Sequence, residues 1–290
     1  MKFVKVGQEI EIPKATLPPI ALAESNVFEI LTLLLGKIKK EKSNSYQLFV
    51  ENVTDKLLSN TKNIGFKRED GKLTQTLEKY KHLLENYNLV RLHLNYLIDG
   101  LGLTEEVFWE NQKTSFPIES FIPSILIQFY YHLISLIELL GRDPALKFYQ
   151  EFVDKYNETV NARNQANIHK SLDEMREEHL EWMKTNPYGR IRVFGEVKDG
   201  QLIRICNNCE KYFSLRNHEM ANDKEIFYTL LCFMHIPLAR VWNPNFVLTI
   251  EKSLARGDPY CAYIYNDMRK RKDAQPPTKE YLDEVWGKNM

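Results

Sequence analysis

The sequence predicts an α+β protein, in which an N-terminal helical bundle (residues 1–115) precedes a domain (residues 116–290) with a small antiparallel sheet packed on helices. Two observations carry this prediction. Apolar residues recur at helical spacing from about residue 24 to residue 184. Residues 189–265, by contrast, have the pattern of a hairpin, a buried helix and a second hairpin, and they contain all four cysteines.

Composition narrows the class of protein. The 290 residues are 43% hydrophobic and 27% charged with a formal net charge of +0, so no overall field would attract nucleic acid or anionic lipid. The first 20 residues show no signal-peptide pattern, and four cysteines without one favour thiols or a metal site over disulfides. We therefore expect a cytoplasmic protein that binds a small molecule, with no nucleic-acid or membrane partner; a homo-oligomer is left open.

The helical part begins after an extended arm, residues 1–20, whose Pro13, Pro18 and Pro19 disfavour a helix. Glycines and prolines then separate the periodic segments, and Gly141 with Asp143 and Pro144 marks the start of one of them. The expected helices are residues 24–42, 45–58, 74–98, 104–109, 120–140, 143–160 and 168–184.

Residues 121–140 form an apolar run almost long enough to span a bilayer. Gln128, His132 and Glu138 interrupt it, and no basic cluster flanks one end only. These features favour a buried central helix.

The first hairpin is predicted from Asp199-Gly200, a strong two-residue turn signal between residues 191–197 and 202–206. In that register Gly195 lies opposite Arg204 and Val193 opposite Cys206, so Arg204 points inward. A buried arginine requires an anionic partner, either a protein carboxylate or a substrate carboxylate. The alternative is a shifted register with a solvated Arg204.

The helix predicted over residues 223–242 is apolar nearly all round and should be buried. Cys232 and His235 are three residues apart and therefore neighbours on one face, and Pro237 must kink or end the helix. A thiol beside an imidazole could form a functional pair, although buried cysteines and histidines are also common core residues.

The second hairpin, residues 246–254 and 260–265, places Cys261, Tyr263 and Tyr265 on one face and has Glu251 as its only acid.

Two kinds of chemistry fit the cysteine-bearing residues 189–265. Cys206 and Cys209 could form half of a zinc or iron site completed by Cys232, His235 or Cys261. Alternatively, Cys232 or Cys206 could be a nucleophile with His235 as general base.

Residues 120–265 resemble the L-2-amino-thiazoline-4-carboxylic acid hydrolase-like family. The resemblance rests on Ile205-Cys206, on Cys232-Phe-Met-His235, on Leu-Ala-Arg-Gly-Asp-Pro-Tyr-Cys (residues 254–261) and on Leu-Gly-Arg-Asp-Pro (residues 140–144). The Gly-Asp-Pro-Tyr-Cys turn is also similar to that of 4-vinyl-reductase-like domains, which are small-ligand and metal-binding sensor domains. In those domains a Glu and cysteines bind zinc, and Glu251, Cys232 and Cys261 stand in comparable positions here. Residues 1–115 have no counterpart in either pattern.

The chain departs from both families. His235 stands where the hydrolase pattern has an Asp, and Ser253 or Leu254 stands where the sensor domains have a further cysteine. The resemblance implies a hydrolase of a small cyclic C–N compound bearing a carboxylate. Under this hypothesis Cys232 is the nucleophile or a ligand and His235 is the base, although the family role of the Asp cannot be carried over to His235. Arg204 then holds the carboxylate, and Cys206 and Glu251 lie at the substrate. The alternatives are a non-catalytic module that senses a small ligand or a metal, and a structural protein whose helical half docks a partner.

Overall fold

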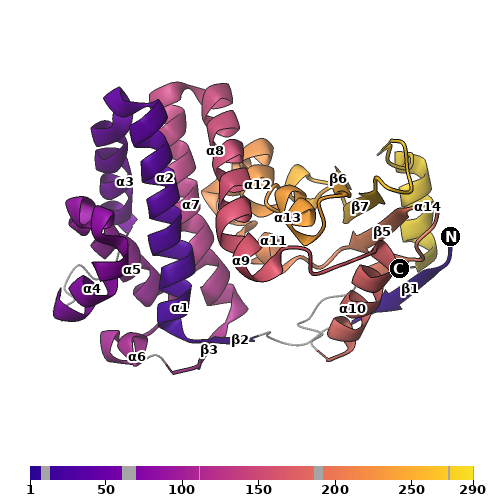
Figure 1. Ribbon diagram of the computed structural model, residues 1–290, viewed down its shortest axis with the longest axis horizontal. Coiled ribbons are helices and arrows are strands. Elements are labelled where there is room, and N and C mark those ends of the chain that lie inside the picture. Colours follow the sequence, from indigo (N-terminus) through magenta and orange to yellow (C-terminus); the bar gives the residue numbers. More distant parts are fainter. Residues whose placement is uncertain (8–13, 61–69, 111, 186–191, 274, 290) are drawn as a thin grey trace. The chain divides into compact units, whose positions relative to one another are not determined.

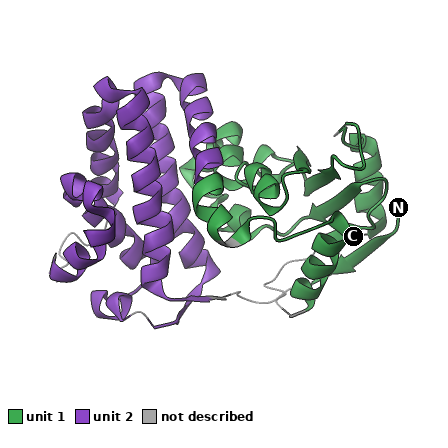
Figure 2. Ribbon diagram, in the orientation of Figure 1, with its two compact units in different colours: residues 1–13, 157–290 green, residues 14–156 purple. Residues whose placement is uncertain are grey.

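A computed structural model describes residues 1–7, 14–60, 70–110, 112–185, 192–273 and 275–289 (Figure 1). It confirms the α+β class. The chain forms two compact units, coloured separately in Figure 2. Unit 1 contains residues 1–13 and 157–290, and unit 2 contains residues 14–156.

Unit 2 is the helical bundle, with a two-stranded antiparallel sheet, β2–β3, beside it. Its elements are β2 (Lys14–Leu17), α1 (Pro19–Ala23), the π-helix η1 (Glu24–Phe28), α2 (Glu29–Glu41), the 3₁₀-helix η2 (Ser43–Ser45), α3 (Tyr46–Asn60), α4 (Asp70–Leu77), the 3₁₀-helix η3 (Glu78–Asn86), α5 (Tyr87–Leu101), α6 (Glu105–Trp109), β3 (Thr114–Pro117), α7 (Ile118–Leu140) and α8 (Arg142–Tyr156).

The division between the units falls elsewhere than at the expected residue 115. Helix α7 packs on α3 and α5, and α8 packs on α2 and α7, so both complete the N-terminal bundle. Near the N-terminus, residues Phe3–Val6 of the expected extended arm form strand β1, which pairs with β4 (Arg192–Gly195) in unit 1. The boundary that packing sets between the units therefore differs from the boundary predicted from the change in sequence pattern.

Two helices in unit 2 differ from the expected ones. The helix predicted over residues 74–98 is interrupted at Tyr80, whose φ of −125° and ψ of 43° are not helical. Only Leu83 is buried between Glu78 and Asn86, so packing does not impose the α-helical period there. Helix α8 begins at Arg142, one residue before the expected cap at Asp143.

Residues Pro19–Glu41 and Ile118–Leu140 are long and apolar enough to cross a membrane by length and composition. The core helices of a folded protein pass the same test, and α7 buries Leu126, Leu133 and Leu136 in the bundle.

Unit 1 is built on a five-stranded antiparallel sheet in the order β1-β4-β5-β7-β6 (Figure 1). Its remaining elements are the π-helix η4 (Asn157–Asn161), α9 (Ala162–Gln165), α10 (Leu172–Thr185), β5 (Gln201–Cys206), α11 (Glu210–Leu215), the 3₁₀-helix η5 (Glu219–Asn222), α12 (Lys224–Leu231), α13 (His235–Trp242), β6 (Phe246–Lys252), the 3₁₀-helix η6 (Leu254–Arg256), β7 (Cys261–Asp267) and α14 (Lys279–Asn289).

The two faces of this sheet differ in chemistry. On one face, Leu282 and Val285 of α14 pack on an aliphatic layer formed by Val193, Ile203, Ile205, Ala262 and Ile264. The residues that alternate with these point to the opposite face, where α10 and α13 pack. Arg192, Arg204 and Tyr263 are on that second face, which we call the arginine face.

Candidate functional site

The hairpin that carries Arg204 has the predicted turn but a different register. Lys198 pairs with Gln201, and Asp199 and Gly200 have φ values of 49° and 72°, as a tight two-residue turn requires. Further along, however, Phe194, not Gly195, lies opposite Arg204. One extra residue is therefore accommodated between the turn and β4, where Glu196 N donates a hydrogen bond to Lys2 O instead of joining the hairpin ladder.

Because of this bulge, Arg204 has different neighbours from those predicted. Gly195 opens no space for the arginine, because it lies on the α14 side, where a Cβ would meet Met1 Sδ at 2.7 Å. Cys206 pairs with Arg192 and not with Val193, and Ile191 lies outside the described residues. Arg204 nevertheless points inward and is only 6% exposed.

Arg204 is held between tyrosines. Its guanidinium carbon lies 4.4 Å from the centre of the Tyr263 ring and 5.4 Å from that of Tyr265, both on β7. These distances are in the range of cation–π attraction, which partly compensates the lost hydration of the guanidinium. Arg204 pairs with Tyr263 across the strands, so β-sheet register sets the stack.

A second arginine lies on the same face. Arg192 pairs with Cys206, two residues along β5 from Arg204, so the two cations are diagonal neighbours. The Nε atoms of Arg192 and Arg204 are both buried without a hydrogen-bond partner among the described residues. Burial is the largest single cause and would lower the pKa of Arg192, but the fields of Cys206, Glu210 and the neighbouring tyrosines together raise it above its ordinary value. Neither arginine forms an ion pair with a carboxylate within the described ranges.

Helices α10 and α13 bring further polar atoms to this face. The His179 ring lies 5.7 Å from Trp242 and 6.4 Å from Phe194. Burial, followed by the charges of Arg204 and Arg192, holds the pKa of His179 well below 6.5, so its ring is neutral. His179 Nδ1 and Tyr265 Oη also lack hydrogen-bond partners in the described part of the chain.

His179, Arg192 and Trp242 were not predicted as site residues from the sequence, although the sequence carries a signal for the first two. His179 lies on the buried stripe of α10, four residues from both Met175 and Met183. Arg192 alternates with Phe194 on a buried strand, so it is a charge on an apolar face. Neither sequence pattern shows which helix or strand packs against His179 or Arg192.

Cys232 and His235 are not joined as thiol and base. The expected helix over residues 223–242 breaks between them, into α12 and α13, and Phe233 O accepts from Ile236 N because Pro237 has no N–H. Cys232 Sγ lies 3.3 Å from Ser253 Oγ, and the His235 ring meets Tyr263 edge-on at 5.5 Å.

The other thiols also have partners within the protein. Cys206 Sγ donates to Asn208 O, and Cys261 Sγ accepts from Leu254 N. Burial is the largest cause that raises the pKa of Cys209, Cys232 and Cys261, each to about 12. At neutral pH these three groups are therefore thiols, not thiolates.

Metal binding by the thiols stays a prediction, because the described residues do not gather them into a ligand set. No group of three or more His, Cys, Asp and Glu side chains is arranged to hold a metal ion within the described ranges. Glu251, which the second family pattern would make a ligand, lies at a β-bulge between Ile250 and Lys252, on the edge strand β6.

Comparison with known proteins adds no family to this geometry: no protein-family description, curated protein or solved structure matches the chain. The residues of the arginine face therefore carry the functional argument alone.

Proposed function

We propose that unit 1 binds a small cyclic compound that bears a carboxylate, and that the carboxylate is held by Arg204 and Arg192 on the arginine face. One observation carries the proposal: Arg192 and Arg204 are diagonal neighbours, and the Nε atom of each is buried without a partner among the described residues. A carboxylate supplies the missing acceptors and neutralises charge where burial makes unpaired charge most unfavourable.

The surroundings favour a ring in the rest of the ligand. Tyr263, Tyr265 and Trp242 present aromatic surface beside the arginines, and the Trp242 and Tyr265 rings are stacked at 6.4 Å. Flat aromatic walls with a few polar groups are typical of small-molecule sites. Reversible binding, as in a ligand sensor, is the function that this arrangement supports best.

Hydrolysis of the ring is the second candidate. Cys261 and Cys232 lie close enough to Tyr263 to raise its pKa, and Tyr263 contacts Arg204, so the two thiols lie near a ligand held by that arginine. A neutral thiol could add to a ring C=N carbon through sulfur and pass its proton to the ring nitrogen. Water would then replace the sulfur as the ring C–N bond breaks, which regenerates the thiol.

Binding is tested by calorimetry with proline, pyroglutamate and thiazolidine-4-carboxylate, each against the corresponding carboxamide, which lacks the carboxylate. We expect a carboxylate to bind and Arg204→Met to weaken it by about 10- to 100-fold, which is the effect of losing a charged hydrogen bond. Arg216→Met, an exposed arginine on the same unit, is the matched control. Equal binding of acid and amide, or an unchanged affinity in Arg204→Met, contradicts the proposal.

Turnover is a separate measurement, made by following ring opening of the bound carboxylate with NMR. Cys232→Ser should abolish it and leave the affinity unchanged if the thiol is the nucleophile. Binding without turnover in the native protein would support the sensor function and contradict the hydrolase function.

A further inference from the structure

His179 lies where α10 and α13 meet the arginine face. The centre of its ring is 6.4 Å from that of Phe194, which lies directly opposite Arg204 and two residues from Arg192 on the same face of the sheet. The Trp242 ring of α13 is 5.7 Å away on the other side of the contact. His179 is therefore beside the two cations to which we assign the carboxylate.

The charged groups that face His179 are basic. Its Nδ1 atom is buried without a hydrogen-bond partner in the described part of the chain. The charges of Arg204 and Arg192, from two strands of the sheet, act on the ring most strongly, followed by His169, whose ring is 5.8 Å away. On α10 itself, the carboxylate of Glu178 lies 3.1 Å from His169 Nδ1 and is thus directed to the other histidine.

This arrangement links the proton of His179 to the ligand. Burial is the largest cause of the low pKa of His179, and the fields of Arg204 and Arg192 come next. A carboxylate bound to the arginines cancels much of their field, so it removes a cause that opposes protonation of the ring. Linkage is reciprocal: a proton on His179 strengthens carboxylate binding by the same factor.

Given the carboxylate site proposed above, on which this inference rests, we propose that His179 takes up a proton when the carboxylate binds to Arg204 and Arg192. The bound state then has three positive groups around one anion, whereas the free state has two. The site therefore binds its ligand more tightly in mildly acidic solution and releases it as the pH rises. His179 is partly exposed to solvent, which supplies the proton.

The neighbouring histidine is the matched control. The His169 ring also contacts Trp242, at 5.6 Å, but it has Glu178 as a counter-charge. A proton on His169 is compensated by that carboxylate and adds little net charge at the arginines. His169→Gln should therefore keep the linkage that His179→Gln removes.

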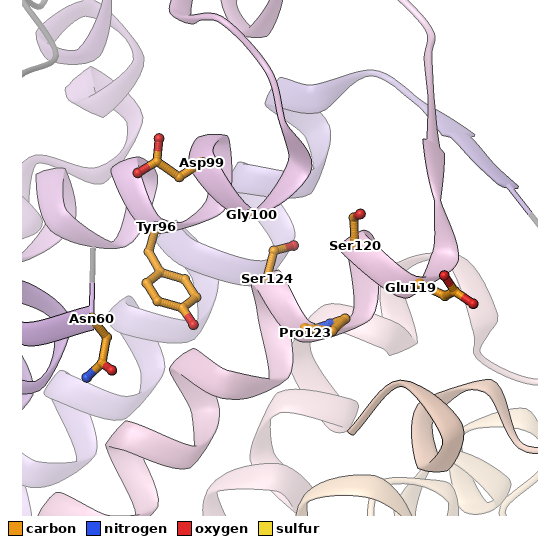
Figure 3. A pocket seen from close by; sticks show the side chains of 8 residues that line it. All are labelled: Asn60, Tyr96, Asp99, Gly100, Glu119, Ser120, Pro123 and Ser124. Atoms are coloured by element: carbon orange, nitrogen blue, oxygen red, sulfur yellow. The ribbon is translucent and has the colours of Figure 1, made fainter. Parts of the chain in front are cut away.

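The cavity of about 310 Å³ in unit 2 offers a carboxylate no cation. Figure 3 shows its lining, whose eight described residues include Asp99 and Glu119 and no lysine or arginine. Like charges repel, so an anionic ligand is disfavoured there. Heat measured with a carboxylate therefore does not come from this cavity.

The test is titration calorimetry on the full chain at pH 7 and pH 5.5 with pyroglutamate or proline, neither of which has a group that titrates in this range. An α-carboxyl group titrates at about pH 3.5, so the ligand keeps its charge throughout. We expect the native affinity to rise by about threefold or more at pH 5.5. At pH 6, the heats in Bis-Tris and in imidazole buffer should differ as net proton uptake requires.

His179→Gln should bind within about threefold of the native affinity at pH 7, without the rise at pH 5.5 and without proton uptake, because the ring is neutral in the free protein. His169→Gln should show both. If His179→Gln does not fold, nitrogen-15 NMR of the histidine rings decides the question. The ligand should then protonate a ring that contacts Trp242 and that is still present in His169→Gln.

The carboxylate site and its proton linkage fail in different ways. Absence of binding by both ligands at both pH values would overturn the two together. Binding with equal affinity at pH 7 and pH 5.5 and without proton uptake would overturn the linkage alone. A pH dependence that survives in His179→Gln, or that is lost in His169→Gln, would also overturn the assignment to His179.

Discussion

The arginine face of unit 1 and four buried polar residues of helix α7 in unit 2 (the α7 polar row: Ser124, Gln128, His132 and Ser135) both contain buried polar atoms without partners among the described residues, but of opposite kinds. The arginine face has spare donors, the Nε atoms of Arg192 and Arg204. The α7 polar row has spare acceptors, Gln128 Oε1 and His132 Nδ1. Buried polar groups are nearly always satisfied in native proteins, so each of these atoms carries a cost in free energy that a partner of the right charge would remove.

The histidines sharpen the comparison, because acid affects the two regions differently. His93, His132 and His179 are all neutral in the folded chain, and burial is the largest cause in each. A proton on His132 would add a donor to a region that lacks donors. A proton on His179 would add a third positive charge beside two arginines.

The largest effect should come from acid. The pKa of His93 falls from 6.5 to about 4, so the unfolded chain takes up the proton first. Stability is therefore full above pH 6.5 and falls as the pH drops towards 4, by about 3 kcal/mol from His93 alone. Urea unfolding between pH 7 and pH 4 measures this loss.

His93→Phe is the control for the acid effect, and it should flatten the pH dependence. His82→Phe, an exposed histidine of the same unit, should leave it unchanged. A native stability that is constant from pH 7 to pH 4 would contradict the neutral assignment of His93.

The next effect is steric. Gly100→Ala places a Cβ against Ser124 where α5 and α7 cross, and overpacking of this kind costs about 1–3 kcal/mol. Gly36→Ala, where a Cβ meets nothing within 4 Å, should instead be neutral or stabilising. Thermal unfolding of the two variants distinguishes a steric clash at the helix crossing from a general effect of replacing a helical glycine by alanine.

A smaller effect is expected from the arginine face without ligand. Arg204→Met replaces an unpaired buried charge with an apolar side chain among tyrosines, so the free protein should become more stable by about 1 kcal/mol. Denaturant unfolding in the absence of carboxylates measures this change. A loss of several kcal/mol would mean that a protein acceptor holds Arg204, and the anion site would lose its basis.

The smallest predicted effect concerns reactivity and not stability. Because Cys232 and Cys261 are buried with pKa values of about 12, an aromatic disulfide reagent at pH 8 should modify them slowly in the native chain. Reaction should be fast in denaturant. Rapid native modification of Cys232 would restore the activated nucleophile that the sequence pattern predicted.

Much of the fold follows from local pattern. The Asp199-Gly200 turn, the pairing of β6 with β7 and the shared face of Cys261 and Tyr263 depend on neighbouring residues, and the structure confirms them. The place of Gly195 was predicted incorrectly, because the bulge that moves it depends on Lys2, nearly two hundred residues away.

The candidate sites were harder to predict for the same reason. The inward position of Arg204 could be inferred from alternation along one strand. Its neighbours His179 and Trp242 come from two separate helices, and only tertiary packing brings them to the sheet. In unit 2, Gln128 and His132 were visible only as interruptions in an apolar run. Whether His132 Nδ1 is an acceptor depends on the tautomer of His93, which a hydrogen bond to Leu89 determines.

The central claim, that the arginine face selects a carboxylate, is tested most directly by one binding experiment. Calorimetry with a cyclic carboxylate is run on the native chain, on Arg204→Met and on Arg216→Met. We predict that Arg204→Met loses most of the affinity for the carboxylate and that Arg216→Met keeps it. Native affinity in Arg204→Met, or an equal loss in both variants, would contradict the account.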